Sequence, residues 1–368
     1  MADTTRKRRW FAFRLRTLLV VFLVLGSLLT PLALKLQQAR KQRQVVDWMR
    51  ENGAAVGYDW QSTDATSPPG PEWFRSWIGD EIFQTVRFVN FSDSQVKDLK
   101  RLRNVSSLQE LHFSRTRVSD LSALKKLTNL RELGLSETQV SDLSPLQGLT
   151  NLQVLHLQQT MVSDLTPLKQ LTNLQRLDIR WTPVRDLSPL QKLPNLQVLH
   201  LANSRFSDLL FLDRLKNLRE LHLHYMKVSD LSPLQGLSHL QQLDLRQTQV
   251  NDLSPLQELP KLQQLDLRHS QIPDLSSLQK LTNVRILHLD YHKFGDLSYL
   301  KGLTKLRELT LRGSPVRSRA PDRGLTDGLE DWDQEKAAHV AVRRLRKALP
   351  SCQIVWDGSK LPYSKLWP

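Results

Sequence analysis

Apolar residues follow a strict period of 22 residues along most of the chain, from Val86 to about Val316. The copies follow the consensus LxxLxLxxTxVxDLxPLxxLxN, in which x is mostly polar. Apolar residues at positions 1, 4 and 6 predict a short strand, and leucines at positions 14, 17 and 20 predict a tight helical turn of the α or 3-10 type. Eleven copies follow one another without an insertion, starting at Val86, Leu108, Leu130, Leu152, Leu174, Leu196, Leu218, Leu240, Leu262, Val284 and Leu306.

Some polar residues repeat as regularly as the leucines. Position 9 is usually Thr, and position 13 is Asp in copy after copy, as at Asp142. A Thr hydroxyl bonds turn backbone, and an Asp before a helical turn accepts backbone N–H groups, so both columns are predicted to be structural rather than a ladder of metal ligands. Ser-Pro pairs such as Ser144-Pro145 suit the N-cap and the first residue of that turn.

The repeat resembles the 22-residue class of leucine-rich repeats found in bacterial internalin-like proteins, including their D-x-x-P-L segment. The resemblance covers residues 86–316. It implies an α/β fold, a right-handed solenoid with parallel strands on its concave face and short α or 3-10 turns on its convex face. Physical reasoning agrees, because one 22-residue unit cannot bury its leucines whereas a stack of units can.

The flanks of the array predict five further regions. These are a basic tail (1–16), a transmembrane helix (17–36), a juxtamembrane helix and linker (37–70), an N-terminal cap rich in Trp and Phe (71–85), and a C-terminal cap and tail (317–368). In the C-terminal cap, residues 337–349 form an amphipathic helix with Val340, Leu345 and Leu349 on one side, and residues 354–356 form a final strand. Cys352, the single cysteine, is expected to be buried and excludes an intramolecular disulfide.

The membrane prediction depends on residues 17–34, which carry no charge. As a helix they would extend about 27 Å, close to the ~30 Å apolar core of a bilayer. An uncleaved anchor is favoured over a signal peptide because no A-x-A-like site follows. The N-terminal flank has slightly more basic residues, which favours a cytoplasmic N-terminus and a repeat domain outside the cytoplasm.

The net charge of +15 is concentrated at the N-terminus, where residues 1–50 contain 11 Lys and Arg against two acids. The remainder is only weakly basic, so no nucleic-acid partner is predicted. No nucleophile elbow, P-loop, H-E-x-x-H or dinucleotide motif is present, and neither catalysis nor a cofactor or metal is predicted.

The variable positions 3, 5, 7 and 8 are expected to face the concave side. Position 5 gathers half of the ten histidines of the chain in one column with several aspartates: His112, His156, Asp178, His200, His222 and His288. Three interpretations are open for this column: a solvated hydrogen-bonding ladder, a face whose binding responds to pH, and a metal or catalytic site.

A partner-binding surface is predicted from the aromatic and arginine residues of the same variable positions. Trp, Tyr and Arg dominate interface energies most often, and Trp181 is the only one of nine tryptophans inside a repeat. The predicted surface consists of Arg180, Trp181, His200, His222, Tyr225, Arg246 and Tyr291.

The sequence therefore predicts a membrane-anchored recognition or scaffold protein that binds a protein or peptide through its concave face. The alternative is a structural element of the cell envelope without a specific ligand. A metal-dependent enzyme that uses the His/Asp ladder is the third hypothesis.

Overall fold

The computed structural model describes residues 4–62, 67–203, 208–270, 272–291, 297–313 and 331–357. The chain divides into two compact units, Met1–Phe91 and Ser92–Pro368. This boundary lies inside the first of the predicted repeats. The predicted C-terminal region is described only over residues 331–357.

The first unit contains a long helix, two paired strands and short helical segments. Its elements are α1 (Thr4–Glu51), β1 (Ala55–Tyr58), η1 (Asp59–Ser62), α2 (Glu72–Ile78), η2 (Asp80–Ile82) and β2 (Val86–Asn90). β1 pairs with β2 in antiparallel orientation. Val46 and Met49 of α1 are buried, and the Trp48 ring lies 5.6 Å from that of Phe91. The end of α1, which the sequence predicts to be a juxtamembrane helix, is therefore part of the packed unit.

The aromatic residues of the predicted N-terminal cap behave differently from one another. Trp73 and Trp77 on α2 are 71% and 79% exposed. These two rings of the predicted cap therefore contribute little buried apolar surface. Phe74 and Phe83 do pack together, with ring centroids 5.8 Å apart.

α1 is one continuous helix that runs through Pro31 and includes the predicted segment 17–36. No helix in the described part of the chain contains a stretch long and apolar enough to cross a bilayer. Most side chains up to residue 32 lie outside that described part. The helical form of the segment is as predicted, and its membrane-spanning role receives no support here.

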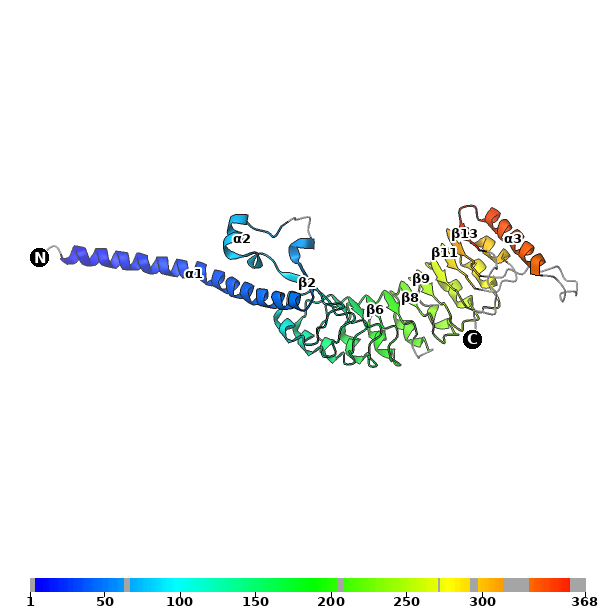
Figure 1. Ribbon diagram of the computed structural model, residues 1–368, viewed down its shortest axis with the longest axis horizontal. Helices are drawn as coiled ribbons and strands as arrows, with labels where there is room; N and C mark the ends of the chain where they lie inside the picture. The colour runs from blue at the N-terminus through cyan, green and yellow to red at the C-terminus, as the bar shows by residue number, and fades with distance from the viewer. Residues whose placement is uncertain are drawn as a thin grey trace. The chain divides into compact units, whose positions relative to one another are not determined.

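The second unit is a parallel sheet in which every strand except the last two is followed by a 3-10 turn (Figure 1). The strands are β3 (Glu110–His112), β4 (Glu132–Gly134), β5 (Val154–His156), β6 (Arg176–Asp178), β7 (Val198–His200), β8 (Glu220–His222), β9 (Gln242–Asp244), β10 (Gln264–Asp266), β11 (Ile286–His288), β12 (Glu308–Thr310) and β13 (Gln353–Val355). The turns are η3 (Lys100–Asn104), η4 (Ser122–Lys126), η5 (Ser144–Leu146), η6 (Thr166–Gln170), η7 (Ser188–Lys192), η8 (Leu210–Arg214), η9 (Ser232–Leu234), η10 (Ser254–Glu258), η11 (Ser276–Lys280) and η12 (Ser298–Gly302). From β3 to β12, neighbouring strands pair residue i with residue i+22, which confirms the predicted register.

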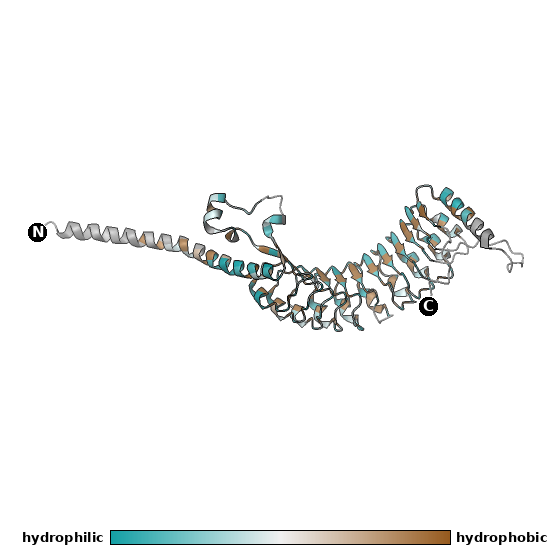
Figure 2. Ribbon diagram, in the orientation of Figure 1, coloured by the Kyte–Doolittle hydropathy of each residue, from teal (hydrophilic) through white to brown (hydrophobic). Residues whose placement is uncertain are grey.

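The leucine positions form the core of this unit. Leu196, Leu199 and Leu201, at positions 1, 4 and 6 of one copy, are completely buried. Figure 2 shows apolar residues recurring from strand to strand through the array. Burying a leucine side chain stabilises the folded state by roughly 1.5–3 kcal/mol, so the repeated column supplies the main stabilisation of the solenoid.

The recurrent polar residues bond the turns, as predicted. The Thr138 hydroxyl donates to the carbonyl oxygen of Leu135 at 2.6 Å. Asp142 accepts the Ser144 N–H and its hydroxyl, both at 2.8 Å. Ser144 is the first residue of η5 and Pro145 the second. Both therefore lie one residue further into the turn than predicted, and Ser144 is not the N-cap. Asp142 caps the turn, because its carboxylate reaches the N–H two residues ahead.

The C-terminal cap consists of α3 (Asp331–Ala348) and β13. β13 pairs with β12, which confirms the predicted final strand. Leu345 and Leu349 are buried, but Val340 is half exposed and Val342 takes its place in the core. Cys352 is half-buried rather than buried, and burial raises the pKa of its thiol to about 11.

Candidate functional site

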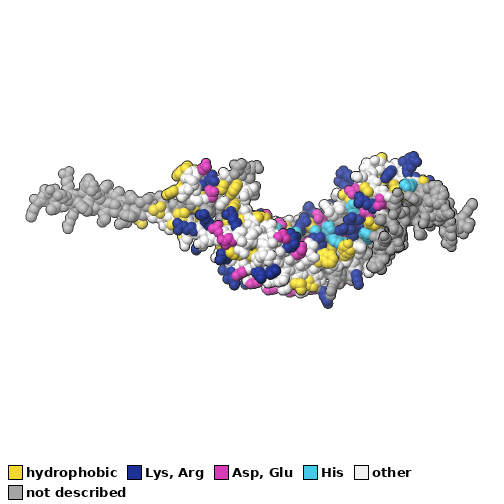
Figure 3. All heavy atoms as spheres, viewed as in Figure 1, with side chains coloured by type: hydrophobic (Ala, Val, Ile, Leu, Met, Phe, Trp, Pro, Cys, Tyr) yellow, Lys and Arg dark blue, Asp and Glu magenta, His cyan; other side chains and the backbone are white. Residues whose placement is uncertain are grey.

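The position-5 residues form one continuous column across the sheet. Asp178 pairs with His200, His200 with His222, and His222 with Asp244 in register. Figure 3 shows histidines gathered among Lys and Arg side chains on this part of the second unit. The sequence correctly predicted that these residues are neighbours, because a period of 22 residues without insertions places equal positions side by side.

The aspartates of the column are buried, contrary to a fully solvated ladder, and each is covered by the arginine two residues later. Asp178 Oδ1 accepts the backbone N–H of Arg180 at 3.1 Å and its Nε–H at 2.9 Å. Nη2 of the same arginine donates to Oδ2 at 2.6 Å. The same unit occurs twice more, at Asp244–Arg246 and Asp266–Arg268.

These Asp–Arg units keep negative charge beneath the concave surface. Burial alone would raise the pKa of Asp178, but the neighbouring His200 and the hydrogen bonds from Arg180 outweigh it and hold the pKa below its usual range. The same balance lowers the pKa of Asp244, where the neighbouring His222 and His224 and the hydrogen bonds from Arg246 outweigh burial. Sequence reasoning noted single members of this set but missed the D-x-R unit, whose repetition on consecutive strands was the available signal.

The histidines converge between β7 and β9. The rings of His200 and His222 are 4.3 Å apart, and those of His222 and His224 are 6.5 Å apart. Nδ1 of His224 lies 2.8 Å from Oδ2 of Asp244, and Nδ1 of His222 lies 3.5 Å from the same oxygen. His224 and Asp244 were not predicted as site residues. An H-x-H sequence on a strand places both imidazoles on one face, which was the signal.

A second, smaller cluster lies nearer the N-terminal end of the column. The Nε2 atoms of His112 and His156 both lie 3.9 Å from the carboxylate of Glu132. Gly134 separates the two histidines in the column, and a Cβ atom there would lie 2.7 Å from Nδ1 of His112. Glycine therefore leaves the space that the His112 ring occupies. His288 stands apart from both clusters and contacts the Thr310 hydroxyl at 3.1 Å.

We expect His156 to make the unfolding free energy depend on pH. Burial lowers its pKa, Asp178 and Glu132 partly oppose this, and His112 and Arg176 lower it further. Between its folded pKa and about 6.5, this histidine binds more protons in the unfolded state than in the folded state. Its contribution to the unfolding free energy is therefore complete above about pH 6.5 and is lost as the pH falls through the folded pKa.

Denaturant titrations at pH 7.5 and pH 5 measure this loss. His156→Gln should reduce the difference in unfolding free energy between the two pH values. His288→Gln, which changes a histidine of the same column in a distant repeat, is the matched control. Equal pH dependence in wild type and His156→Gln would contradict the assignment.

Position 8 forms a column with an unusual backbone. Ten residues spaced by 22 have positive φ: Asp93, Arg115, Glu137, Gln159, Trp181, Asn203, Tyr225, Gln247, His269 and Tyr291. In the second unit their N–H groups donate to the position-7 carbonyl of the next repeat, as from Trp181 to Ala202 at 3.2 Å. The left-handed conformation therefore extends the backbone ladder beyond the short strands and directs the side chain outward.

Three of these left-handed positions carry aromatic side chains. Trp181 is 49% exposed and Tyr225 is 54% exposed. Tyr291 stacks on His269, with ring centroids 4.2 Å apart at 12°. Of the predicted surface, the structure brings Arg180, His200, His222, Tyr225 and Arg246 onto the consecutive repeats of β6 to β9, together with Trp181. Tyr291 lies three repeats beyond Tyr225.

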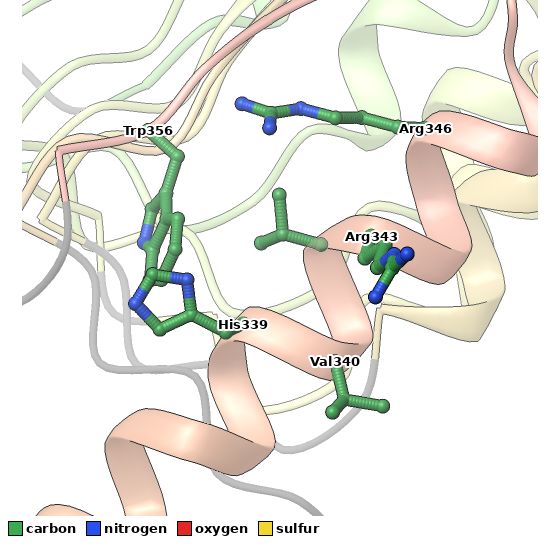
Figure 4. Close-up of a pocket in the computed structure, with 6 residues that line it drawn as sticks. His339, Val340, Arg343, Arg346 and Trp356 are labelled. Atoms are coloured by element: carbon green, nitrogen blue, oxygen red, sulfur yellow. The ribbon is translucent and has the colours of Figure 1, made fainter.

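A cavity of about 410 Å³ lies at the C-terminal cap, between α3 and Trp356 (Figure 4). Arg343, Arg346 and Val340 line it from α3, and the His339 ring packs edge-on against Trp356 at 4.5 Å. Both arginines are exposed. The cavity does not adjoin the His/Asp column.

Comparisons with known proteins identify the repeat. The family model for leucine-rich repeats in two copies matches residues 106–148, 128–170, 150–192 and 216–258. No curated protein sequence matches the chain.

Several solved structures share the fold. An internalin, InlF, from Listeria monocytogenes is 27% identical, with a TM-score of 0.62 over 77% of this chain and 79% of the other. The leucine-rich-repeat protein LIC12759 from Leptospira interrogans is 19% identical, with a TM-score of 0.52 over 69% and 74%. The plant peptide hormone receptor RGFR1, in complex with RGF2, is 18% identical, with a TM-score of 0.54 over 74% and 44%.

Proposed function

We propose that this leucine-rich-repeat protein recognises a protein or peptide partner through the concave surface formed by the repeats of β6 to β9. The surface comprises Arg180, Trp181, His200, His222, Tyr225 and Arg246. Tyr291 extends it toward the C-terminal cap. The proposed activity is binding, without catalysis.

The observation that carries this proposal is the placement of Trp181 and Tyr225. Both have φ near +60°, a conformation that Gly and Asn tolerate and that is unfavourable for bulky residues. A non-glycine residue held there costs roughly 1–3 kcal/mol. About half of each side chain nevertheless remains exposed, so packing within the fold leaves much of each aromatic ring available to a partner.

The polar residues beside the aromatics are held in place before any partner arrives. Arg180 and Arg246 each donate several hydrogen bonds to the aspartate two residues earlier. A side chain that is ordered in the free protein loses less conformational entropy on binding. Because each of these arginines pairs with an aspartate, the concave surface presents paired guanidinium groups and imidazoles rather than a concentration of one charge.

The comparisons support the proposal at the level of the fold. The chain shares its fold with the internalin InlF and with the plant peptide hormone receptor RGFR1, which is in complex with RGF2. The envelope-element alternative predicts no specific partner and gives no reason for aromatics at left-handed positions.

Crosslinking the full-length protein to neighbouring proteins in membranes tests the proposal. Wild type is compared with the double variant Trp181→Ala/Tyr225→Ala and with the control Gln159→Ala, which has the same backbone conformation outside the surface. A defined partner that is lost only from the double variant is expected. Identical crosslinked species in all three would overturn the concave-surface assignment.

Residues 17–36 are further proposed to hold the protein in a membrane, with the repeats outside the cytoplasm. The uncharged apolar run and its place within helix α1 support this proposal. Full-length protein should stay in the pellet when membranes are washed with alkaline carbonate, and Leu23→Lys/Leu29→Lys should reduce that retention. Release of the wild-type protein into the supernatant would contradict the proposal.

A further inference from the structure

We propose that His222, His224 and Asp244 form a binding site for one divalent transition-metal ion such as Zn²⁺. One ligand atom from each residue lies within 4.8 Å of the other two. Imidazole nitrogen and carboxylate oxygen are ordinary zinc ligands, bound at about 2.0–2.2 Å.

The distances suit a single ion. Oδ2 of Asp244 lies 3.5 Å from Nδ1 of His222 and 2.8 Å from Nδ1 of His224. Ligand atoms around a tetrahedral zinc ion are about 3.3 Å apart, as its bond lengths require. Small side-chain rotations therefore suffice. His222 and Asp244 are paired in register on neighbouring strands, and His224 follows His222 two residues later.

The imidazole of His224 already faces the carboxylate of the site. Nδ1 of His224 is buried and lies 2.8 Å from Oδ2 of Asp244. Both ring nitrogens of His200, which packs against His222, are buried next to the site. A metal ion would therefore bind a nitrogen and an oxygen that lie close together before it arrives.

The carboxylate ligand is oriented and ionised. Arg246 donates its backbone N–H and Nε–H to Oδ1 of Asp244 at 3.1 and 2.9 Å. Such outer contacts commonly orient the ligands of metal sites. Hydrogen bonds that outweigh burial keep the pKa of Asp244 below its usual range, so no proton must leave it when a metal binds.

The site has three protein ligands, which leaves a fourth tetrahedral position for water or another donor. His222 is 27% exposed while Asp244 is 7% exposed, so the cluster is accessible from its histidine side. This inference does not depend on the proposed protein partner, because the ion needs only residues of this chain.

Zinc binding to the full-length protein, prepared without a polyhistidine tag and stripped with a chelator, tests the site. Equilibrium dialysis followed by elemental analysis should find about one Zn²⁺ per chain. Because loss of an outer contact already weakens metal sites about 10–100-fold, His224→Asn should weaken affinity at least about 100-fold. Zinc should also raise the melting temperature of wild type and not of this variant.

Two control variants distinguish this site from other groups of side chains in the same column. Glu220→Gln removes the acidic member of an overlapping group with His200 and His222, and His288→Asn removes a distant histidine of the same column. Both should change zinc affinity by less than about 3-fold, since neither is a ligand. Absence of zinc from wild type, unchanged affinity in His224→Asn, or a large loss only in Glu220→Gln would each overturn the proposal.

Discussion

Leu199→Asp should unfold several repeats together. Leu199 is the central residue of β7 and is completely buried, between Leu177 and Leu221 in the adjacent strands. The change removes a leucine, which costs about 2–5 kcal/mol, and places a carboxylate where it has no partner, which adds several kcal/mol. Because repeats are stabilised by their neighbours, the loss should spread along the array.

Thermal melting and amide hydrogen exchange measure this effect. Leu210→Asp is a matched control, because the same substitution is made at a leucine that is 67% exposed at the start of η8. Its cost should stay within about 0.5 kcal/mol. Similar melting shifts in the two variants would contradict the assigned register. Loss of protection confined to β7 would contradict coupling between repeats.

Trp181→Asn should weaken partner binding by about 2 kcal/mol or more, roughly 30-fold in Kd. The same change should maintain or raise the melting temperature. Asn tolerates the left-handed backbone at this position better than Trp, and the exposed half of the indole contributes nothing to the core. A variant that folds better and binds worse would show that Trp181 serves recognition.

Titration of the crosslinked partner, once purified, against wild type and variant provides the affinities. Glu137→Asn is the control, because Glu137 has φ of 58° in an earlier repeat without exposed aromatic neighbours. It should leave affinity unchanged. If Trp181→Asn lowers the melting temperature while affinity stays constant, the indole has a structural role and the proposed surface is wrong at its centre.

Little of the candidate site could be deduced residue by residue, although its location could. The period of 22 residues placed His200 and His222 side by side, since equal positions in successive repeats must be neighbours. It did not indicate that Asp178 is buried beneath Arg180, because burial depends on how a long side chain folds back over the strand. It also did not single out His224 or Asp244, whose importance comes from the distance between their ligand atoms.

The sequence by itself determined the repeat architecture, the strand register, the buried leucines and the structural Thr and Asp columns. A short pattern repeated without insertions permits one way of stacking, so local spacing specifies contacts between repeats. Tertiary structure alone decided which aromatic and polar side chains remain exposed. Trp73 and Trp77 lie outside the packed interior of the first unit, whereas Val46 and Met49 of α1 lie inside it. These outcomes depend on non-repetitive packing, where no periodic neighbour constrains the choice.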